Sequence, residues 1–361
     1  MNDQLHPLTL GEVLDRTAQL YRSRFLVYFG IGFIPAGTVL VFAAAAFVVL
    51  AWLGSNSNSL PSNVQNLLVW AFLGGIGIVA IPVCVGATAL GWVAMCAAAS
   101  HEFLGGEKMT IRAAYQLAWK RKGRYVGLYL AAVLLVAVVP AAVFLGLARG
   151  ADAVNAAARE AGIGGLASLA MFLVLAALFG YAVWMLLRIC LAFPVSLVEQ
   201  IGVRGAIKRA AVLSKGTKGR IFLLYLLGVA LGWILAIGFF LPVGILFAVS
   251  SWTNNPEHAQ MLGMILLFTW YGLWFAVQAF TKPVYGIALT MFYFDQRIRK
   301  EGFDIEWKMR QAGLMSDVLE GVGGVSWLAP ATGRDAATES TPETRSQPRA
   351  AEPPLPGVPP A

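Results

Sequence analysis

The sequence predicts an all-α, polytopic membrane protein, and two observations support this class. Of the 361 residues, 58% are hydrophobic and only 13% are charged, whereas about a quarter of the residues in a soluble domain are charged. The 77 residues from Phe25 to His101 contain no Asp, Glu, Lys or Arg. A transmembrane helix needs about 20 apolar residues, so this stretch alone is long enough for two spans.

Six apolar segments have the length of membrane spans. No water reaches the core of a bilayer, so each segment must satisfy its backbone hydrogen bonds internally, and we expect helices. The alternation of apolar and polar residues that is typical of β-barrel strands does not occur in them. The six segments cover about residues 25–53, 67–100, 125–147, 166–198, 221–249 and 261–294.

Each expected span contains one proline, which removes a backbone hydrogen bond and kinks a helix. Two interpretations account for this pattern: hinged helices of a transporter, or the ordinary composition of membrane helices, in which proline is commoner than in soluble ones. We favour the second. The six residues are Pro35, Pro82, Pro140, Pro194, Pro242 and Pro283.

Basic residues are concentrated in two connecting segments. Residues 101–124 and 199–220 contain six Lys or Arg residues each, whereas 54–66 and 250–260 contain none. Cytoplasmic loops of membrane proteins carry an excess of Lys and Arg. We therefore place both basic segments and both termini in the cytoplasm. The net charge of +8 then reflects membrane topology, and we expect no nucleic-acid partner.

Residues 1–24 are expected to form a cytoplasmic amphipathic segment. Thr9 and Glu12 have the spacing of a helix capping box, and residues 203–211 repeat the amphipathic pattern with Arg204 and Lys208 on the polar face. Such a helix beside a span either lies on anionic lipid or docks on a partner protein, and we favour the lipid surface. The apolar face of the first helix comprises Leu10, Val13, Leu14, Thr17, Leu20 and Tyr21.

Three similar basic turns precede the first, third and fifth spans. The sequence KGRY at 122–125 matches KGRI at 218–221 closely, and RSRF at 22–25 matches them more loosely. The arginines of these turns are 100 and 96 residues apart. This spacing predicts a threefold repeat of amphipathic helix, basic turn and helical hairpin.

The last part of the chain has a different composition. Residues 330–361 contain eight of the 17 prolines, and such a segment cannot bury a core. We therefore expect a six-helix membrane domain with cytoplasmic connecting helices at 25–313, followed by a disordered, Pro/Ala-rich cytoplasmic tail at 314–361.

Three stretches resemble a known family. They are LTLGEVLDRT at 8–17, the segment from Glu199 to Arg209, and FYFDQRIRKEG at 292–302. Together they resemble the bacterial polytopic proteins named for the membrane domain of glycerophosphoryl diester phosphodiesterase. This resemblance implies a bacterial inner-membrane protein. Gln200 and Phe294 depart from the pattern, because a small residue and a second tyrosine are expected there.

The resemblance does not imply the activity in the family's name. In some members this domain is fused to a catalytic barrel, which would need a further 200 residues or more. The longest stretch outside the expected membrane domain is the tail of about 48 residues, from 314 to 361. We therefore expect the catalytic half to be absent.

The spans lack the residues that an enzyme would need. Catalysis at membrane depth requires a nucleophile with a base, or paired carboxylates, but Asp, Glu and His occur no closer than Glu199 and Asp295 at the span ends. A nucleotide-binding GxxxxGK[ST] loop is absent as well, and the three cysteines have no metal-site spacing. We expect a non-enzymatic protein without a cofactor or metal. It is either a membrane scaffold or lipid-interacting accessory subunit, which we favour, or a carrier or permease component for an anionic, lipid-derived substrate.

Arg188 and Lys282 are the only basic residues within the expected spans. Each lies 21 or 22 residues from the outer end of its segment, which is about 32 Å and places it near the inner interface. They either snorkel to lipid phosphates or form a paired anion site. With Arg124 and Arg220 of the basic turns, they are our candidate contacts for anionic inner-leaflet lipid. A protein partner is not identified by the sequence.

Overall fold

The computed structural model describes residues 7–55, 61–104, 108–160, 164–250 and 256–311. Every regular element within these ranges is a helix, so the predicted all-α class is confirmed. The tail predicted at 314–361 lies outside the described residues.

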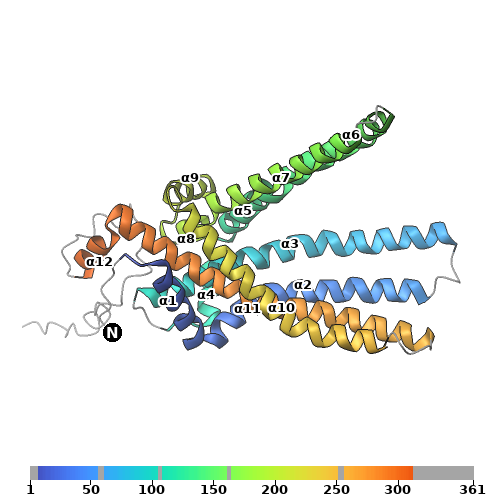
Figure 1. Cartoon of the computed structure of the whole chain (residues 1–361). Coiled ribbons are helices and arrows are strands. Elements are labelled where there is room, and N and C mark those ends of the chain that lie inside the picture. The colour runs from blue at the N-terminus through green and yellow to red at the C-terminus, as the bar shows by residue number, and fades with distance from the viewer. Residues whose placement is uncertain (1–6, 56–60, 105–107, 161–163, 251–255, 312–361) are drawn as a thin grey trace, which may run out of the picture. The chain divides into compact units, whose positions relative to one another are not determined.

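The first group of helices begins with α1 (Leu10–Ser23) and continues into the hairpin of α2 (Phe25–Ser55) and α3 (Ser62–Phe103) (Figure 1). The predicted capping box is present at the start of α1. The Thr9 N–H donates to a Glu12 carboxylate oxygen at 2.6 Å, and the Glu12 N–H donates to the Thr9 hydroxyl at 3.3 Å. Both side chains thereby satisfy backbone donors that a helix start leaves free.

The second group has the same order. The short helix α4 (Ile111–Trp119) precedes a long helical rod, which pairs with the antiparallel α7 (Gly164–Ile189). The rod consists of α5 (Lys122–Val133), the π-helical segment η2 (Leu134–Val138) and α6 (Val139–Glu160).

The third group contains two short helices and a hairpin. α8 (Ala192–Val198) and α9 (Val203–Leu213) precede α10 (Lys218–Ser250) and α11 (Pro256–Glu301), which pack against each other. A last short helix, α12 (Phe303–Gln311), follows Gly302, whose φ of +65° suits a glycine at a helix end.

Two of the prolines coincide with breaks in helix geometry. A proline ring clashes with the carbonyl four residues earlier. For Pro140 this carbonyl belongs to Val136, which lies in η2, so the wider π turn gives the ring room. Pro194 lies in the first turn of α8, where a missing N–H is tolerated. The other four prolines lie inside continuous helices: Pro35, Pro82, Pro242 and Pro283.

Several helices are compatible with a multi-pass membrane protein. Among the described residues, five segments are long and apolar enough to cross a bilayer: Phe25–Leu50, Asn66–Phe103, Lys122–Arg149, Ser168–Val198 and Lys218–Ile245. The sixth expected span, 261–294, lies on α11, which is not one of these five. The sixth span therefore stays a prediction.

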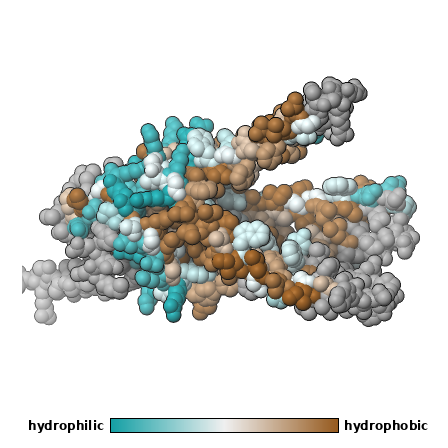
Figure 2. All heavy atoms as spheres, in the orientation of Figure 1, coloured by the Kyte–Doolittle hydropathy of each residue, from teal (hydrophilic) through white to brown (hydrophobic). Residues whose placement is uncertain are grey.

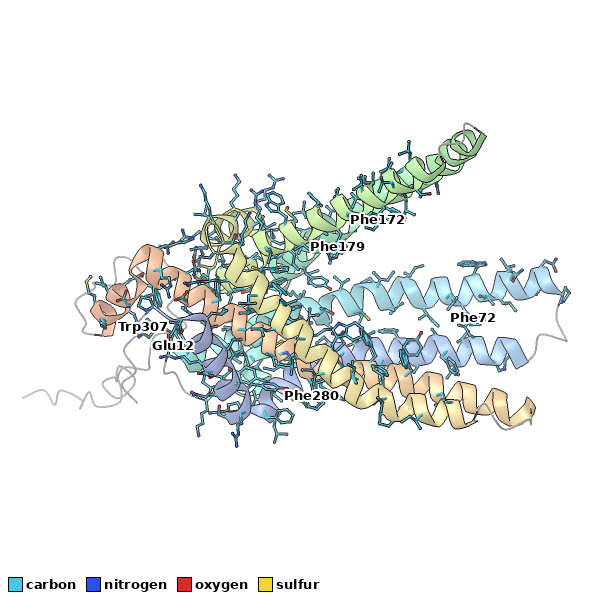
Figure 3. All side chains as sticks on the ribbon, in the orientation of Figure 1. Glu12, Phe72, Phe172, Phe179, Phe280 and Trp307 are labelled. Carbon is cyan, nitrogen blue, oxygen red and sulfur yellow. The ribbon has the colours of Figure 1, made fainter. Side chains whose placement is uncertain are left out.

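Polar residues gather at one end of the helical hairpins, where α1, α4, α8, α9 and α12 lie (Figures 1 and 2). We call this part the basic end. The hairpins α2–α3, α6–α7 and α10–α11 extend from it (Figure 1). We call the described residues of their outer parts, within 33–86, 139–186 and 229–276, the arms. Phe72, Phe172 and Phe179 project from the arms (Figure 3) and are 45%, 65% and 72% exposed.

The buried core lies next to the basic end, around the C-terminal half of α11. Phe292 and Tyr293 are at most 1% exposed there, and α11 contacts α1, α2, α3, α8, α9 and α10. Small residues permit this close packing. Gly32 of α2 lies against α11 so closely that an added Cβ would be 2.9 Å from the Ala279 carbonyl oxygen and from the Pro283 ring.

The apolar face of α1 packs on α11. Val13 and Thr17 are buried, and the Tyr21 hydroxyl donates to the Phe280 carbonyl at 3.2 Å. The chain itself thus covers part of this face, and that part does not meet lipid as we expected. In α9, the basic residues Arg204 and Lys208 are exposed, as the amphipathic pattern predicts.

Candidate functional site

Arg188 lies near the C-terminal end of α7 and is exposed. Its guanidinium carbon is 5.2 Å from the centroid of the Trp184 ring, one helical turn earlier. The ammonium of Lys218, from the start of α10, is 4.9 Å from the same centroid. Two cations from different helices therefore share one indole, and neither is paired with a carboxylate in the described part of the chain.

A second tryptophan has a similar neighbour at another basic turn. Trp119, at the end of α4, is 59% exposed, and the Lys122 ammonium is 4.5 Å from its ring centroid. Tryptophan is enriched where membrane meets water, because its ring is apolar and its N–H polar. Trp119 and Trp184 therefore each contact a lysine of one of the basic turns.

Arg124 and Arg220 have different surroundings. The Arg124 side chain is half-buried and its Nη1 donates to the Gln200 carbonyl at 2.6 Å, so it joins the start of α5 to the turn between α8 and α9. Gln200 has a φ of 52°, a conformation that favours glycine. Arg220 is exposed in the first turn of α10.

Lys282 is half-buried on α11. It is level with the first turns of α2, because its neighbour Phe280 packs on Phe29 with ring centroids 4.9 Å apart. α11 packs mainly with α10, α2, α3 and α1, whereas α7, which carries Arg188, packs mainly with α6 and η2. No interaction among the described residues joins Lys282 to Arg188, so the structure does not bring the expected pair together.

A buried carboxylate fastens the N-terminal segment to α11. Asp295 is 1% exposed and accepts hydrogen bonds from the Leu8 N–H at 2.7 Å, from Gln296 Nε2 at 3.0 Å and from Arg299 Nε at 2.9 Å. Arg299 also donates to the Leu8 carbonyl. This pair satisfies both backbone groups of Leu8, and the same motif carries the family resemblance.

A second charged cluster joins α8, α9 and α11. Glu199 accepts hydrogen bonds from Arg209 Nε at 3.0 Å and from the Tyr293 hydroxyl at 3.2 Å. Arg209 also pairs with Glu301, which pairs in turn with Arg297 Nε at 3.2 Å. Every charged side chain in this cluster is thus paired with one of opposite charge. We infer that the cluster has a structural role and holds together segments that are far apart in the sequence.

Burial and ion pairing act against each other in this cluster. Burial lowers the pKa of Arg209, but the pull of Glu199 and Glu301 outweighs it, so the pKa is raised above the ordinary value. Lys300, by contrast, has a lowered pKa because burial dominates. Its ammonium donates to the Leu213 carbonyl at 2.7 Å, near the end of α9, where a helix favours positive charge.

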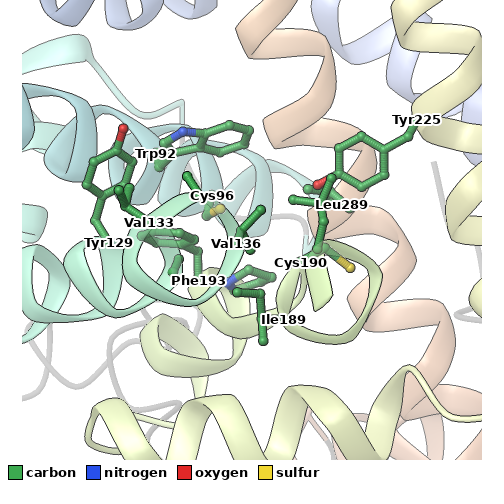
Figure 4. Close-up of a pocket in the computed structure, with 14 residues that line it drawn as sticks. Trp92, Cys96, Tyr129, Val133, Val136, Ile189, Cys190, Phe193, Tyr225 and Leu289 are labelled. Atoms are coloured by element: carbon green, nitrogen blue, oxygen red, sulfur yellow. The ribbon is translucent and has the colours of Figure 1, made fainter. Parts of the chain in front are cut away.

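An apolar cavity of about 240 Å³ lies between α3, α5, η2, α7, α8, α10 and α11 (Figure 4). Its lining includes Trp92, Tyr129, Val136, Phe193 and Tyr225, and no lining residue is charged. An apolar filling is therefore favoured.

Sequence reasoning missed Trp184 and Lys218 as neighbours of Arg188. Trp184 and Arg188 are four residues apart, a spacing that places both on one face of a helix. The contact between these two residues could therefore have been predicted from the sequence. The approach of Lys218 depends on how α10 packs beside α7, which no local pattern encodes. The cavity could not be predicted either, because its walls come from five separate segments of the chain.

The comparisons with known proteins give no further guidance. No family model, no curated protein and no solved structure matches this chain. The resemblance to the membrane-domain family stays a prediction. Within the described ranges, no group of three or more His, Cys, Asp or Glu side chains is placed to hold a metal ion.

Proposed function

We propose that this protein is a non-enzymatic, multi-pass inner-membrane protein that binds anionic lipid at its basic end. It would serve as a membrane scaffold or as a lipid-interacting accessory subunit. The observation that carries this proposal is the arrangement of Arg188 and Lys218 on Trp184, with ring distances of 5.2 and 4.9 Å and no carboxylate partner among the described side chains.

The electrostatics favour an anion between these two cations. Like charges this close repel each other, and a phosphate placed between them removes the repulsion while accepting hydrogen bonds from both. Each basic residue near an anionic membrane surface contributes about 1 kcal/mol to binding. The indole anchors the site at the membrane interface, where lipid phosphates lie.

The membrane orientation in this proposal has six spans and both termini in the cytoplasm. The clustering of polar side chains at the end where α1 and α12 lie supports it. Reporter fusions after Asn58, Gly162 and Asn254 should then report the outside, and fusions after Lys108 and Ser214 the inside. The reverse pattern would refute the orientation.

We also propose the threefold repeat and the family membership. The order of elements supports them, because α1, α4 and α9 each precede a basic turn and a long helical hairpin. Family membership carries no catalytic claim. Purified protein should release no glycerol phosphate from glycerophosphodiesters, and release that a point mutation in this chain abolished would refute the non-enzymatic assignment.

The alternative is a carrier or permease component for an anionic, lipid-derived substrate. The cavity is the feature that favours transport, but its lining carries no charge, so it suits an apolar chain better than an anionic group. Flux of a labelled anionic lipid across vesicles that contain the purified protein would support the carrier.

Lipid exchange measured by native mass spectrometry tests the favoured function. The wild-type chain should retain phosphatidylglycerol in preference to phosphatidylcholine, and R188A/K218A should lower that preference roughly 30-fold, because two cations of about 1 kcal/mol each are removed. R149A, an exposed arginine on α6 far from this site, is the matched control. K282A shows separately whether Lys282 contributes. An unchanged preference in the double variant would refute the proposal.

A further inference from the structure

The apolar cavity described above lies at a defined depth below the basic turns. Tyr129 follows Arg124 by five residues, and Tyr225 follows Arg220 by five, and both tyrosines line the cavity. At 1.5 Å per residue, each is about 7.5 Å from its arginine. Half of the hydrocarbon thickness is about 15 Å. On the proposed membrane orientation, the cavity is therefore level with the acyl chains of the leaflet on the basic side.

The α5–η2 rod forms one wall of the cavity and also has an exposed apolar side. Leu130 and Leu134 on this rod are 51% and 52% exposed, while Val136 of η2 lines the cavity. The π turn is a local widening of the helix, and such segments occur frequently at functional sites. One rod thus contacts both the cavity and the outer surface of the chain.

Three aromatic side chains in the lining carry hydrogen-bond donors. In the described part of the chain, the indole N–H of Trp92 and the hydroxyls of Tyr129 and Tyr225 form no hydrogen bond. Donors in an apolar surrounding normally find an acceptor. The ester carbonyls of a phospholipid are the acceptors that a bilayer offers just below its phosphate level.

We propose that this cavity binds one acyl chain of a phospholipid from the leaflet on the basic side, with its ester carbonyl hydrogen-bonded to Tyr129. This inference rests on the proposed function and adds a second, uncharged point of contact to it. A charged substrate does not fit, because the lining has no charged residue. An apolar chain suits this lining better than water does, because most of the lining side chains are apolar.

Photocrosslinking tests the site directly. The full chain in bilayers is exposed to phosphatidylcholine with a diazirine on its acyl chain, and the labelled peptides are identified by mass spectrometry. Labelling should concentrate on peptides that contain Tyr129, Val136 and Phe193. V136F fills the cavity and should lower this labelling at least fivefold, whereas V138F, on the exposed side of the same rod, should leave it unchanged. Wild-type labelling in V136F would overturn the proposal.

A second variant keeps the test valid if V136F is misfolded. Y129F removes one hydroxyl and no volume. The wild-type chain should bind an ester-linked lipid about two to ten times more tightly than its ether-linked analogue, and Y129F should abolish this difference. Equal binding of the two lipids by the wild-type chain would overturn the hydrogen bond. Label found on a second copy of the chain would identify an interface instead and overturn the acyl-chain site.

The two proposals fail separately in these experiments. The headgroup of phosphatidylcholine has no net charge, so the cavity test does not require an anionic lipid to bind at Arg188 and Lys218. If cavity labelling persists while R188A/K218A keeps its lipid preference, only the anionic surface site is wrong. If that preference is lost as expected while cavity labelling is absent, only the acyl-chain site is wrong.

Discussion

The core near the basic end and the arms are built from the same long helices, but apolar side chains are buried in the core and exposed on the arms. On α3, Val93 and Met95 are at most 2% exposed, whereas Trp70 and Ile78 of the same helix are 74% and 77% exposed. The core therefore owes its stability to packing within the chain. The arms expose an apolar surface that water would not tolerate and a bilayer would solvate.

This difference shows which part of the molecule contains the contacts that stabilise the fold. The charged clusters of Asp295 and Glu199 lie beside the core, so buried packing and ion pairing reinforce each other at one end. The arms are joined to this end, but few of their described side chains are buried. We expect mutations to have large effects in the core and small ones on the arms.

The largest effect is expected from F292A. Phe292 is 1% exposed, and removing a buried Phe ring costs about 3 to 5 kcal/mol. The control F172A truncates a ring that is 65% exposed and should change stability by less than about 0.5 kcal/mol. Reversible unfolding in mixed detergent micelles, followed by tryptophan fluorescence, measures both. Equal losses would remove the distinction between core and arms.

D295A should have the next largest effect. It removes a buried carboxylate that accepts hydrogen bonds from Arg299 and from the Leu8 N–H, and a buried donor left without its acceptor costs about 1 to 3 kcal/mol. Limited proteolysis should also cut more readily near residue 8, because the segment before α1 loses its attachment. The control D15A replaces an exposed aspartate on α1. It should neither lower stability nor speed up proteolysis near residue 8. Unchanged proteolysis in D295A would show that Asp295 does not attach the N-terminal segment to α11.

Glycine substitutions sharpen the comparison further. In G32A the new methyl group would meet the Ala279 carbonyl and the Pro283 ring, both 2.9 Å away and both rigid, so we expect a loss of about 1 to 3 kcal/mol. G74A lies on the arm of α3 with nothing within 4 Å of the added Cβ. It should be neutral or stabilise the helix by up to about 1 kcal/mol. Thermal unfolding of the two variants, compared with wild type, decides between these outcomes.

Local signals in the sequence predicted local structure well. The capping box of Thr9 and Glu12 and the helical nature of the apolar segments are confirmed, because each depends on neighbours a few residues away. The packing partners of α11 were not predictable. Ion pairs such as Arg209 with Glu301 join residues that are far apart in the chain, and periodicity says nothing about which faces meet.

The same limit applies to the candidate site. Length arguments place Arg188 and Lys282 at similar depths, but depth fixes only one coordinate of a side chain. The two residues lie on α7 and α11, which pack mainly with different neighbours. The basic turn that supplies Lys218 was recognised, yet its contact with Trp184 needed the tertiary structure. Arg124 has a positioning contact with Gln200 that a search for exposed cations overlooks.

The smallest effect is expected at Gln200, in the turn that Arg124 holds. Its φ of 52° lies in the left-handed region, which costs a residue with a side chain about 1 kcal/mol or more relative to glycine. Q200G should therefore raise the free energy of unfolding by up to about 1 kcal/mol, while Arg124 keeps its hydrogen bond to the backbone carbonyl. The control Q116G places a glycine inside α4, at an exposed helical position, and should lower stability by about 1 kcal/mol. Chemical unfolding of both variants shows whether each substitution raises or lowers the free energy of unfolding. A loss of stability in Q200G would mean that contacts of the Gln200 side chain outweigh the backbone strain, and would explain why this turn departs from the small residue expected there.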